Sequence, residues 1–222
     1  MVCPWAYFVK GRKTIMVDSK KVLDIIDKMK EDIIENKAFL TELDNVIGDG
    51  DHGINLARGF SKVEEKYASL EGKDIGTILK TVGMTLVSTV GGASGPLYGT
   101  AFMKAGAYLN GKTEIDFPMF IAALKEATAG IQLRGKSTTG EKTMLDAIVP
   151  ATKAMEEKFE ETNDAKQALM AGVKAAEEGV EYTKTIIATK GRASYLGERS
   201  IGHQDPGATS FTHILTVIAN EI

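Results

Sequence analysis

The sequence has a single cysteine, Cys3, so no disulfide can form within the chain. It contains no apolar run that approaches the roughly 18–20 residues a membrane span requires. Acidic and basic residues nearly balance, with a formal net charge of −3, and no cluster of lysine or arginine offers a face to nucleic acid. These absences argue against a disulfide scaffold, a membrane protein and a nucleic-acid binder, and they predict a cytoplasmic protein.

Strand patterns are also missing, because no stretch alternates convincingly between apolar and polar residues. Apolar residues recur with helical spacing along nearly the whole chain instead. This spacing predicts helices over about 19–40, 53–67, 74–90, 96–109, 117–133, 143–159, 164–189 and 206–222, with residues 191–205 as a loop. We therefore expect an all-α domain of about eight helices over residues 16–222. Residues 1–15 are predicted to be a disordered lead-in.

Three aspartates, Asp44, Asp49 and Asp51, lie within eight positions between the first two predicted helices. Like charges this close repel one another unless a cation compensates them. Mg²⁺ binds carboxylate oxygens and completes its shell with water or phosphate oxygens, so the residues favour a Mg²⁺ site that holds a nucleotide. An EF-hand fails, because the twelfth residue from Asp49 is Phe60 instead of glutamate. A turn rich in Asp and Gly for conformational reasons alone stays an alternative.

Glycine-rich or Asp-Pro turns lead into several predicted helix starts, near residues 52–53, 92–96, 140–143 and 205–207. The first N–H groups of a helix lack partners and its dipole makes that end positive, so helix starts bind anions. If these starts meet at one end of the fold, they make a phosphate cradle. Each one alone is also explained as an ordinary cap or a tight connection. A Walker loop is absent.

The segment 190–207 is longer and more polar than a simple helix connection needs, which is typical of a functional lid. Arg192 could reach phosphate oxygens from it, although a solvated loop is the alternative. His52 suits phosphate orientation, whereas His213 lies among apolar residues and is expected to be structural. A phosphohistidine carrier, modified on His52 or His203, stays a rival class.

Four motifs of this sequence resemble those of the nucleotide-binding DhaL subunits of bacterial dihydroxyacetone kinases. They are residues 43–53, 91–99, 140–144 and 191–207, and the resemblance runs from about residue 18 to the end. It implies an antiparallel eight-helix barrel with a deep nucleotide pocket at one end. It also implies that Asp44, Asp49 and Asp51 coordinate two Mg²⁺ ions that hold the nucleotide diphosphate.

The resemblance further implies a set of nucleotide contacts but assigns no catalytic residue to this chain. The contacts are His52, Gly53, Ile54 and Asn55 at the phosphates, Ala93 and Ser94 from the glycine-rich turn, Gly135 and Met144 beside the adenine, and Arg192, Asp205, Pro206 and Gly207 closing the pocket.

The function implied is that of a phosphotransferase subunit in glycerol metabolism. ADP would stay bound and be rephosphorylated in place to ATP by a phosphohistidine on a DhaM-like partner of the phosphotransferase system. The γ-phosphoryl would then pass to dihydroxyacetone on a DhaK-like partner, because this chain lacks a substrate domain. The nucleotide half of a directly ATP-consuming kinase and a nucleotide-sensing module stay open as alternatives. The oligomeric state, a homodimer included, is also open.

Overall fold

The computed structural model describes residues 15–222, so the predicted lead-in lies outside the described residues apart from Ile15. The described chain is mostly helical. Its elements are β1 (Val17–Asp18), α1 (Ser19–Glu35), α2 (Lys37–Ile47), α3 (His52–Glu64), α4 (Tyr67–Leu70), α5 (Ile75–Thr89), α6 (Ser94–Tyr108), β2 (Glu114–Ile115), α7 (Phe117–Gly135), α8 (Leu145–Thr162), α9 (Ala165–Thr183), the 3₁₀ segment η1 (Arg192–Ser200) and α10 (Pro206–Glu221). β1 and β2 form one short antiparallel pair. The all-α prediction is confirmed.

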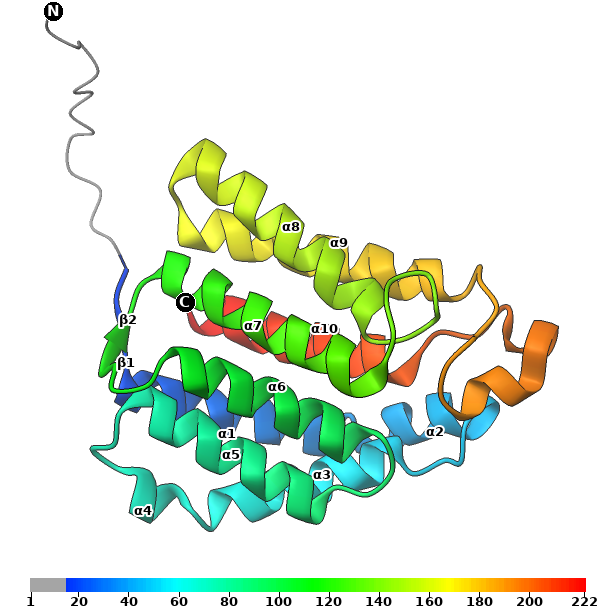
Figure 1. Ribbon diagram of the computed structural model, residues 1–222, viewed down its shortest axis with the longest axis horizontal. Helices are drawn as coiled ribbons and strands as arrows, with labels where there is room; N and C mark the ends of the chain where they lie inside the picture. The colour runs from blue at the N-terminus through cyan, green and yellow to red at the C-terminus, as the bar shows by residue number, and fades with distance from the viewer. Residues whose placement is uncertain (1–14) are drawn as a thin grey trace, which may run out of the picture.

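Eight helices form a closed ring in which each packs against the next. The order is α1, α3, α5, α6, α7, α8, α9 and α10, and α10 packs against α1 to close it. Neighbouring helices of the ring run antiparallel, so the starts of α3, α6, α8 and α10 lie at one end of it (Figure 1). The strand pair β1–β2 lies at the opposite end. This topology gathers the predicted helix-start motifs at the same end as the loop between α2 and α3.

Aspartate caps begin five of the helices. A carboxylate at the cap accepts the backbone N–H three residues on, which would otherwise lack a partner inside the helix. The pairs are Asp18–Lys21, Asp74–Thr77, Asp116–Met119, Asp164–Gln167 and Asp205–Ala208. The first helix, predicted to begin at about residue 19, is thus capped by Asp18.

Several helix boundaries differ from the sequence expectation. The single helix predicted over about 19–40 is in fact two helices, α1 and α2. α1 ends because the Asn36 side chain donates to the Asp32 carbonyl at 2.9 Å. α9 stops at Thr183 instead of continuing to 189. The stretch expected as a loop contains η1, which bends at Gly197, where φ is 56°. Pro150 lies inside α8 without ending it.

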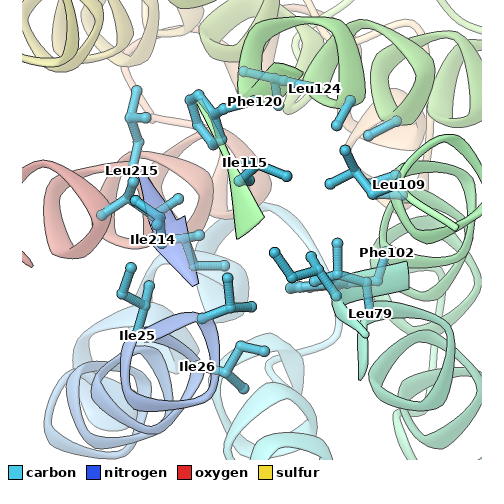
Figure 2. A pocket seen from close by; sticks show the side chains of 18 of the residues that line it. Ile25, Ile26, Leu79, Phe102, Leu109, Ile115, Phe120, Leu124, Ile214 and Leu215 are labelled. Atoms are coloured by element: carbon cyan, nitrogen blue, oxygen red, sulfur yellow. The ribbon is translucent and has the colours of Figure 1, made fainter. Parts of the chain in front are cut away.

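The interior of the ring is apolar and incompletely filled. A cavity of about 200 Å³ lies between the helices, and among residues 15–222 Asp116 is the only charged residue in its lining. Figure 2 shows side chains of α1, α5, α6, α7 and α10 pointing into it, with Ile115 of β2 among them. This cavity is not the expected nucleotide pocket, whose depth stays a prediction. None of the helices in residues 15–222 is long and apolar enough to cross a membrane.

Candidate functional site

The three predicted metal ligands converge where α2 ends and α3 begins. Carboxylate oxygens of Asp44, Asp49 and Asp51 all lie within 4.8 Å of one another. Asp44 is buried in the last turn of α2, and its Oδ2 accepts the backbone N–H groups of Asp51 (2.9 Å) and His52 (3.1 Å). Gly50 has a φ of +71°, which lets the loop turn back toward α2. The loop is thus built around Asp44, with the other two carboxylates beside it.

The charge of this cluster is only partly compensated. Within residues 15–222, the ion pair that reaches it comes from Arg192, whose Nε lies 2.8 Å from Asp49 Oδ2. Three carboxylates and one guanidinium leave two negative charges, which one divalent cation would neutralise. The donor set consists of hard oxygens, as Mg²⁺ prefers, and a second ion would need oxygens from a ligand to complete its shell. The residues therefore fit the predicted Mg²⁺ site.

The starts of α3 and α6 face this loop. A Cβ added at Gly92, just before α6, would lie 3.6 Å from Asp51 Oδ1. A Cβ at Gly53 would lie 2.2 Å from the Lys37 carbonyl oxygen, so only glycine lets α3 begin this close to α2. Ala93 caps α6 and is exposed, and Ser94 is its first residue. Anion binding at these two helix starts stays a prediction, and at the start of α3 the His52 N–H already donates to Asp44.

Of the two residues that follow Gly53, the structure turns one outward and one inward. Ile54 is 49% exposed, and its contact with a phosphate stays a prediction. Asn55 is buried, and its Oδ1 accepts Arg58 Nη2 at 2.7 Å. A Cβ at Gly91 would lie 3.1 Å from the Asn55 side chain, so this amide supports the glycine-rich turn.

His52 is buried, and both of its ring nitrogens have partners. Nδ1 lies 2.8 Å from Ser94 Oγ, and Nε2 lies 2.9 Å from Ser210 Oγ. Burial lowers the pKa of His52 to about 4, although Asp44 and Asp51 oppose the shift. The ring is therefore neutral at pH 7 and has no free nitrogen for phosphorylation. Its predicted contribution to phosphate binding would have to pass through Ser94.

Lys142 has a structural role that the sequence analysis does not address: it holds two loops together. Its side chain is buried, and Nζ donates to the carbonyl oxygens of Thr183 (2.5 Å) and His203, with Ile186 O at 3.5 Å. Burial lowers the pKa of this ammonium. Lys142 lies between α7 and α8, whereas its acceptors are Thr183 at the end of α9 and residues that follow it, so it ties the 136–144 loop to both ends of the 184–205 segment.

Asp146 organises the same α7–α8 loop from the first turn of α8. Its carboxylate accepts the N–H groups of Thr143 (2.8 Å) and Gly140. The Thr-x-x-Asp spacing is a capping-box signature, so the sequence contained a signal for this role. No comparable pattern marks Lys142, because its acceptors are backbone carbonyls about 40 and 60 residues away.

The predicted base and closing residues lie around the same end. Gly135 ends α7, and a Cβ there would lie 3.4 Å from Leu97 of α6. Met144 is buried, and a Cβ at Gly207 would lie 3.5 Å from its Cβ. Met144 and Gly207 are thus neighbours, whereas Gly135 lies beside α6. A role for Gly135 and Met144 at the adenine stays a prediction.

Asp205 and Pro206 form the start of α10 as expected. Asp205 Oδ2 accepts the Ala208 N–H at 2.7 Å, and Pro206 occupies the first helical position. Burial raises the pKa of Asp205 to about 7, with Asp146 and Asp44 adding to the shift and Lys142 opposing it. This carboxyl therefore titrates near neutral pH.

The segment predicted as a lid reaches the aspartate loop through Arg192, the first residue of η1. It is an ordered structure, because buried Ser200 accepts the Ala188 N–H at 3.0 Å and donates to the Gly197 carbonyl at 2.7 Å. Figure 1 shows this segment beside α2 at the end where the helix starts gather. The predicted site residues therefore share one end of the ring.

The fold and this constellation define a helical-barrel protein with an aspartate cluster and several helix starts at one end, and comparison with known proteins gives its family. The DAK2 domain family matches residues 46–220, and the chain belongs to it. It is 47% identical to "PEP-dependent dihydroxyacetone kinase, ADP-binding subunit DhaL" of Escherichia coli, over 82% of this chain and 86% of that one. It is 42% identical to the "PTS-dependent" ADP-binding subunit DhaL of Lactococcus lactis, over 92% and 100% of the two chains. The resemblance drawn from the sequence is confirmed.

Two solved structures share the fold. They are the dihydroxyacetone kinase of C. freundii in its native form and in complex with AMP-PNP and Mg²⁺, each with a TM-score of 0.71. They are 24% and 22% identical to this chain and cover all of it, while it spans 38% of each solved chain. The helical barrel is therefore an architecture known from a longer enzyme.

Proposed function

We propose that this chain is the ADP-binding subunit of a phosphoenolpyruvate-dependent dihydroxyacetone kinase. The observation that carries the proposal is the convergence of Asp44, Asp49 and Asp51 with the starts of α3 and α6 at one end of the ring. Similarity to subunits that bear this name, over most of both chains, supports it. In this proposal, residues 16–222 form a single nucleotide-binding domain.

In this proposal, Asp44, Asp49 and Asp51 hold two Mg²⁺ ions. The ions supply positive charge that neutralises phosphate oxygens during phosphoryl transfer. The chain itself binds and orients: the N–H groups at the starts of α3 and α6 face the phosphates, and Arg192 offers a guanidinium above the aspartate loop. Asp205, Pro206 and Gly207 shape the wall beside Met144. No side chain of this chain is required as a nucleophile.

ADP would remain bound between turnovers and become ATP only transiently. The partners would be a DhaM-like subunit that donates the phosphoryl group from a phosphohistidine and a DhaK-like subunit that holds dihydroxyacetone. A cytoplasmic location goes with this proposal, because ADP, ATP and phosphoenolpyruvate are cytoplasmic metabolites. A homodimer is compatible with it but is not needed for the chemistry.

Reconstitution with the two partner subunits tests the donor. The purified chain is loaded with ADP and Mg²⁺ and supplied with dihydroxyacetone and either phosphoenolpyruvate plus the phosphotransferase proteins or free ATP. We expect dihydroxyacetone phosphate from phosphoenolpyruvate and much less from ATP. Turnover from ATP alone would assign the chain to a directly ATP-consuming kinase, and nucleotide binding without turnover from either donor would assign it to a sensor.

The phosphohistidine carrier has its own outcome in this assay. Acid-labile phosphate on His203, formed without nucleotide, would support it. Phosphorylation of His52 is disfavoured because both ring nitrogens are already hydrogen-bonded in the buried interior.

A further inference from the structure

Four side chains form an unbroken line of hydrogen bonds from the interior of the ring to the site. Tyr98 OH lies 2.7 Å from Ser210 Oγ, which lies 2.9 Å from His52 Nε2. His52 Nδ1 lies 2.8 Å from Ser94 Oγ. The first three side chains are buried, whereas Ser94 is half-buried at the start of α6. The Ser94 hydroxyl is therefore the end of the line that a ligand can meet.

Tyr98, at the inner end of this line, determines which group donates and which accepts in each of its hydrogen bonds. Within the described residues, the hydrogen-bond partner of the Tyr98 hydroxyl is Ser210 Oγ. A buried hydroxyl rarely leaves its hydrogen unpaired, so Tyr98 donates and Ser210 accepts. Ser210 then has one hydrogen of its own and two acceptors in reach, His52 Nε2 at 2.9 Å and the Gly207 carbonyl at 3.1 Å.

The imidazole is the better acceptor of the two. Gly207 is in the first turn of α10, where a carbonyl already accepts the backbone N–H four residues on. The Nε2 of His52 has no such second donor. If Ser210 donates to Nε2, the ring hydrogen must be on Nδ1, which donates to Ser94 Oγ. Ser94 then keeps its own hydrogen for a partner outside the line.

We propose that this line fixes His52 as the Nδ1–H tautomer, so that Ser94 presents a hydrogen-bond donor to a phosphate oxygen. Tyr98 and Ser210 are then positioning residues for phosphate binding, acting through His52 on Ser94. If the ring hydrogen were on Nε2 instead, Ser94 would donate its hydrogen to Nδ1. It would then present only lone pairs to the ligand, and these repel a phosphate oxygen. The inference rests on the proposed function only for the identity of the anion, a nucleotide phosphate.

The place of Ser94 suits such a donor. It begins α6, whose free N–H groups and dipole favour an anion at that point. The turn just before it approaches the Asp51 carboxylate. A phosphate held by cations at Asp51 would therefore lie near both the helix start and the Ser94 hydroxyl.

The first test reads the tautomer directly, without any ligand. Nitrogen-15 shifts of the histidine rings distinguish a nitrogen that carries hydrogen from one that does not, and His203→Gln and His213→Asn variants assign the three rings by elimination. We expect His52 to be protonated on Nδ1 only. A ring protonated on Nε2, or on both nitrogens, would overturn the proposed direction. In Tyr98→Phe, Ser210 no longer receives a hydrogen bond, and we expect a mixture of tautomers.

The second test asks whether Ser210 acts through Ser94. Affinity for ADP with Mg²⁺ is measured for Ser210→Ala, Ser94→Ala and the double variant. We expect Ser210→Ala to weaken ADP binding about 5- to 10-fold, the worth of one hydrogen bond, and to add less than about 2-fold in the Ser94→Ala background. Equal losses in both backgrounds would show a merely structural effect and would overturn the proposal.

Controls separate the possible failures. Thr212→Val removes another buried hydroxyl of α10, one that donates only to the Ala208 carbonyl within its own helix, and should leave ADP affinity unchanged. If Ser210→Ala does not fold, Tyr98→Phe takes its place in the cycle, because it keeps the ring and removes only the donor. A wild-type chain that binds no ADP would defeat the proposed function, and the tautomer measurement would still decide the inference.

Discussion

Asp205 meets two conflicting demands at neutral pH. Its carboxylate caps α10 by accepting the Ala208 N–H, yet burial raises its pKa to about 7. Asp146 and Asp44 add to the shift, and the buried Lys142 ammonium only partly offsets it. The cap therefore stabilises the start of α10 while the charge that comes with it is unfavourable above pH 7.

We expect Asp205→Asn to stabilise the protein at alkaline pH. The native state binds the Asp205 proton more tightly than the unfolded chain, so this stabilisation is complete below about pH 4 and is lost as pH rises through 7. Asparagine keeps an acceptor for Ala208 without the charge. Urea unfolding of the chain without Mg²⁺ should show the variant gaining on wild type between pH 4 and pH 8, by up to about 4 kcal/mol. A difference that does not change with pH would contradict the assignment.

Lys142 supports a second residue-level prediction. Lys142→Met keeps the buried length but leaves the Thr183 and His203 carbonyls without their donor, so we expect a loss of about 2–4 kcal/mol in unfolding free energy. Lys190→Met is the control, since Lys190 is partly exposed and only pairs with Glu141 at 3.6 Å. It should cost less than about 0.5 kcal/mol. Equal losses in urea unfolding would mean that Lys142 does not tie the two loops.

At the scale of elements, η1 contacts the aspartate loop through one exposed ion pair, which joins Arg192 to Asp49. Arg192 is 66% exposed and Asp49 35%, so their contact adds little to stability. Arg192 would contribute to ligand affinity only when a phosphate oxygen replaces the Asp49 carboxylate as its partner.

Arg192→Ala is therefore expected to leave the melting temperature unchanged and to weaken ADP binding about 10- to 100-fold, as the loss of a charge-assisted hydrogen bond implies. Titration calorimetry with Mg²⁺ measures the affinity. Arg199→Ala, an exposed arginine at the end of the same segment, is the matched control and should change affinity less than about 2-fold. Wild-type affinity for ADP in Arg192→Ala would show that Arg192 does not contact the nucleotide and that η1 is only structural.

The helices and the site also show which features could be predicted from the sequence. Helical spacing and Asp-Pro signals predict the long helices and the start of α10, because these depend on neighbouring residues. The break at Asn36 was missed, since the apolar stripe continues through it and only a local side-chain bond ends α1. The aspartate cluster could be predicted because its ligands are close in sequence. The His52–Ser210–Tyr98 line could not, because its contacts join residues more than 100 positions apart.

For the whole molecule, a ring of eight helices separates two environments. One end holds the aspartate cluster and Arg192, and the starts of α3, α6, α8 and α10 gather there (Figure 1). The interior toward β1 and β2 holds the apolar cavity (Figure 2). Tyr98 lines that cavity and also begins the hydrogen-bond line to Ser94. Alternating helix direction, a property of the entire ring, is what places the helix starts together.

Filling the cavity tests the packing of the ring. Ala105 of α6 lines it, so Ala105→Leu should raise the unfolding free energy by about 1 kcal/mol by burying apolar surface in existing space. Ala107→Leu, at an exposed position of the same helix, should change it by less than about 0.5 kcal/mol. A destabilised Ala105→Leu in thermal unfolding would mean that the space is already filled or too tight.

The most direct test of the account is the nucleotide content of the purified chain, desalted with and without a chelator, for wild type and Asp51→Asn. We predict about one ADP per wild-type chain after desalting, its loss on chelation, and little ADP in a folded Asp51→Asn variant, because the aspartates hold the nucleotide through Mg²⁺. ADP content that neither chelation nor Asp51→Asn changes, or a wild-type chain that cannot be loaded with ADP and Mg²⁺, would contradict the claim that this carboxylate cluster is the nucleotide's metal site.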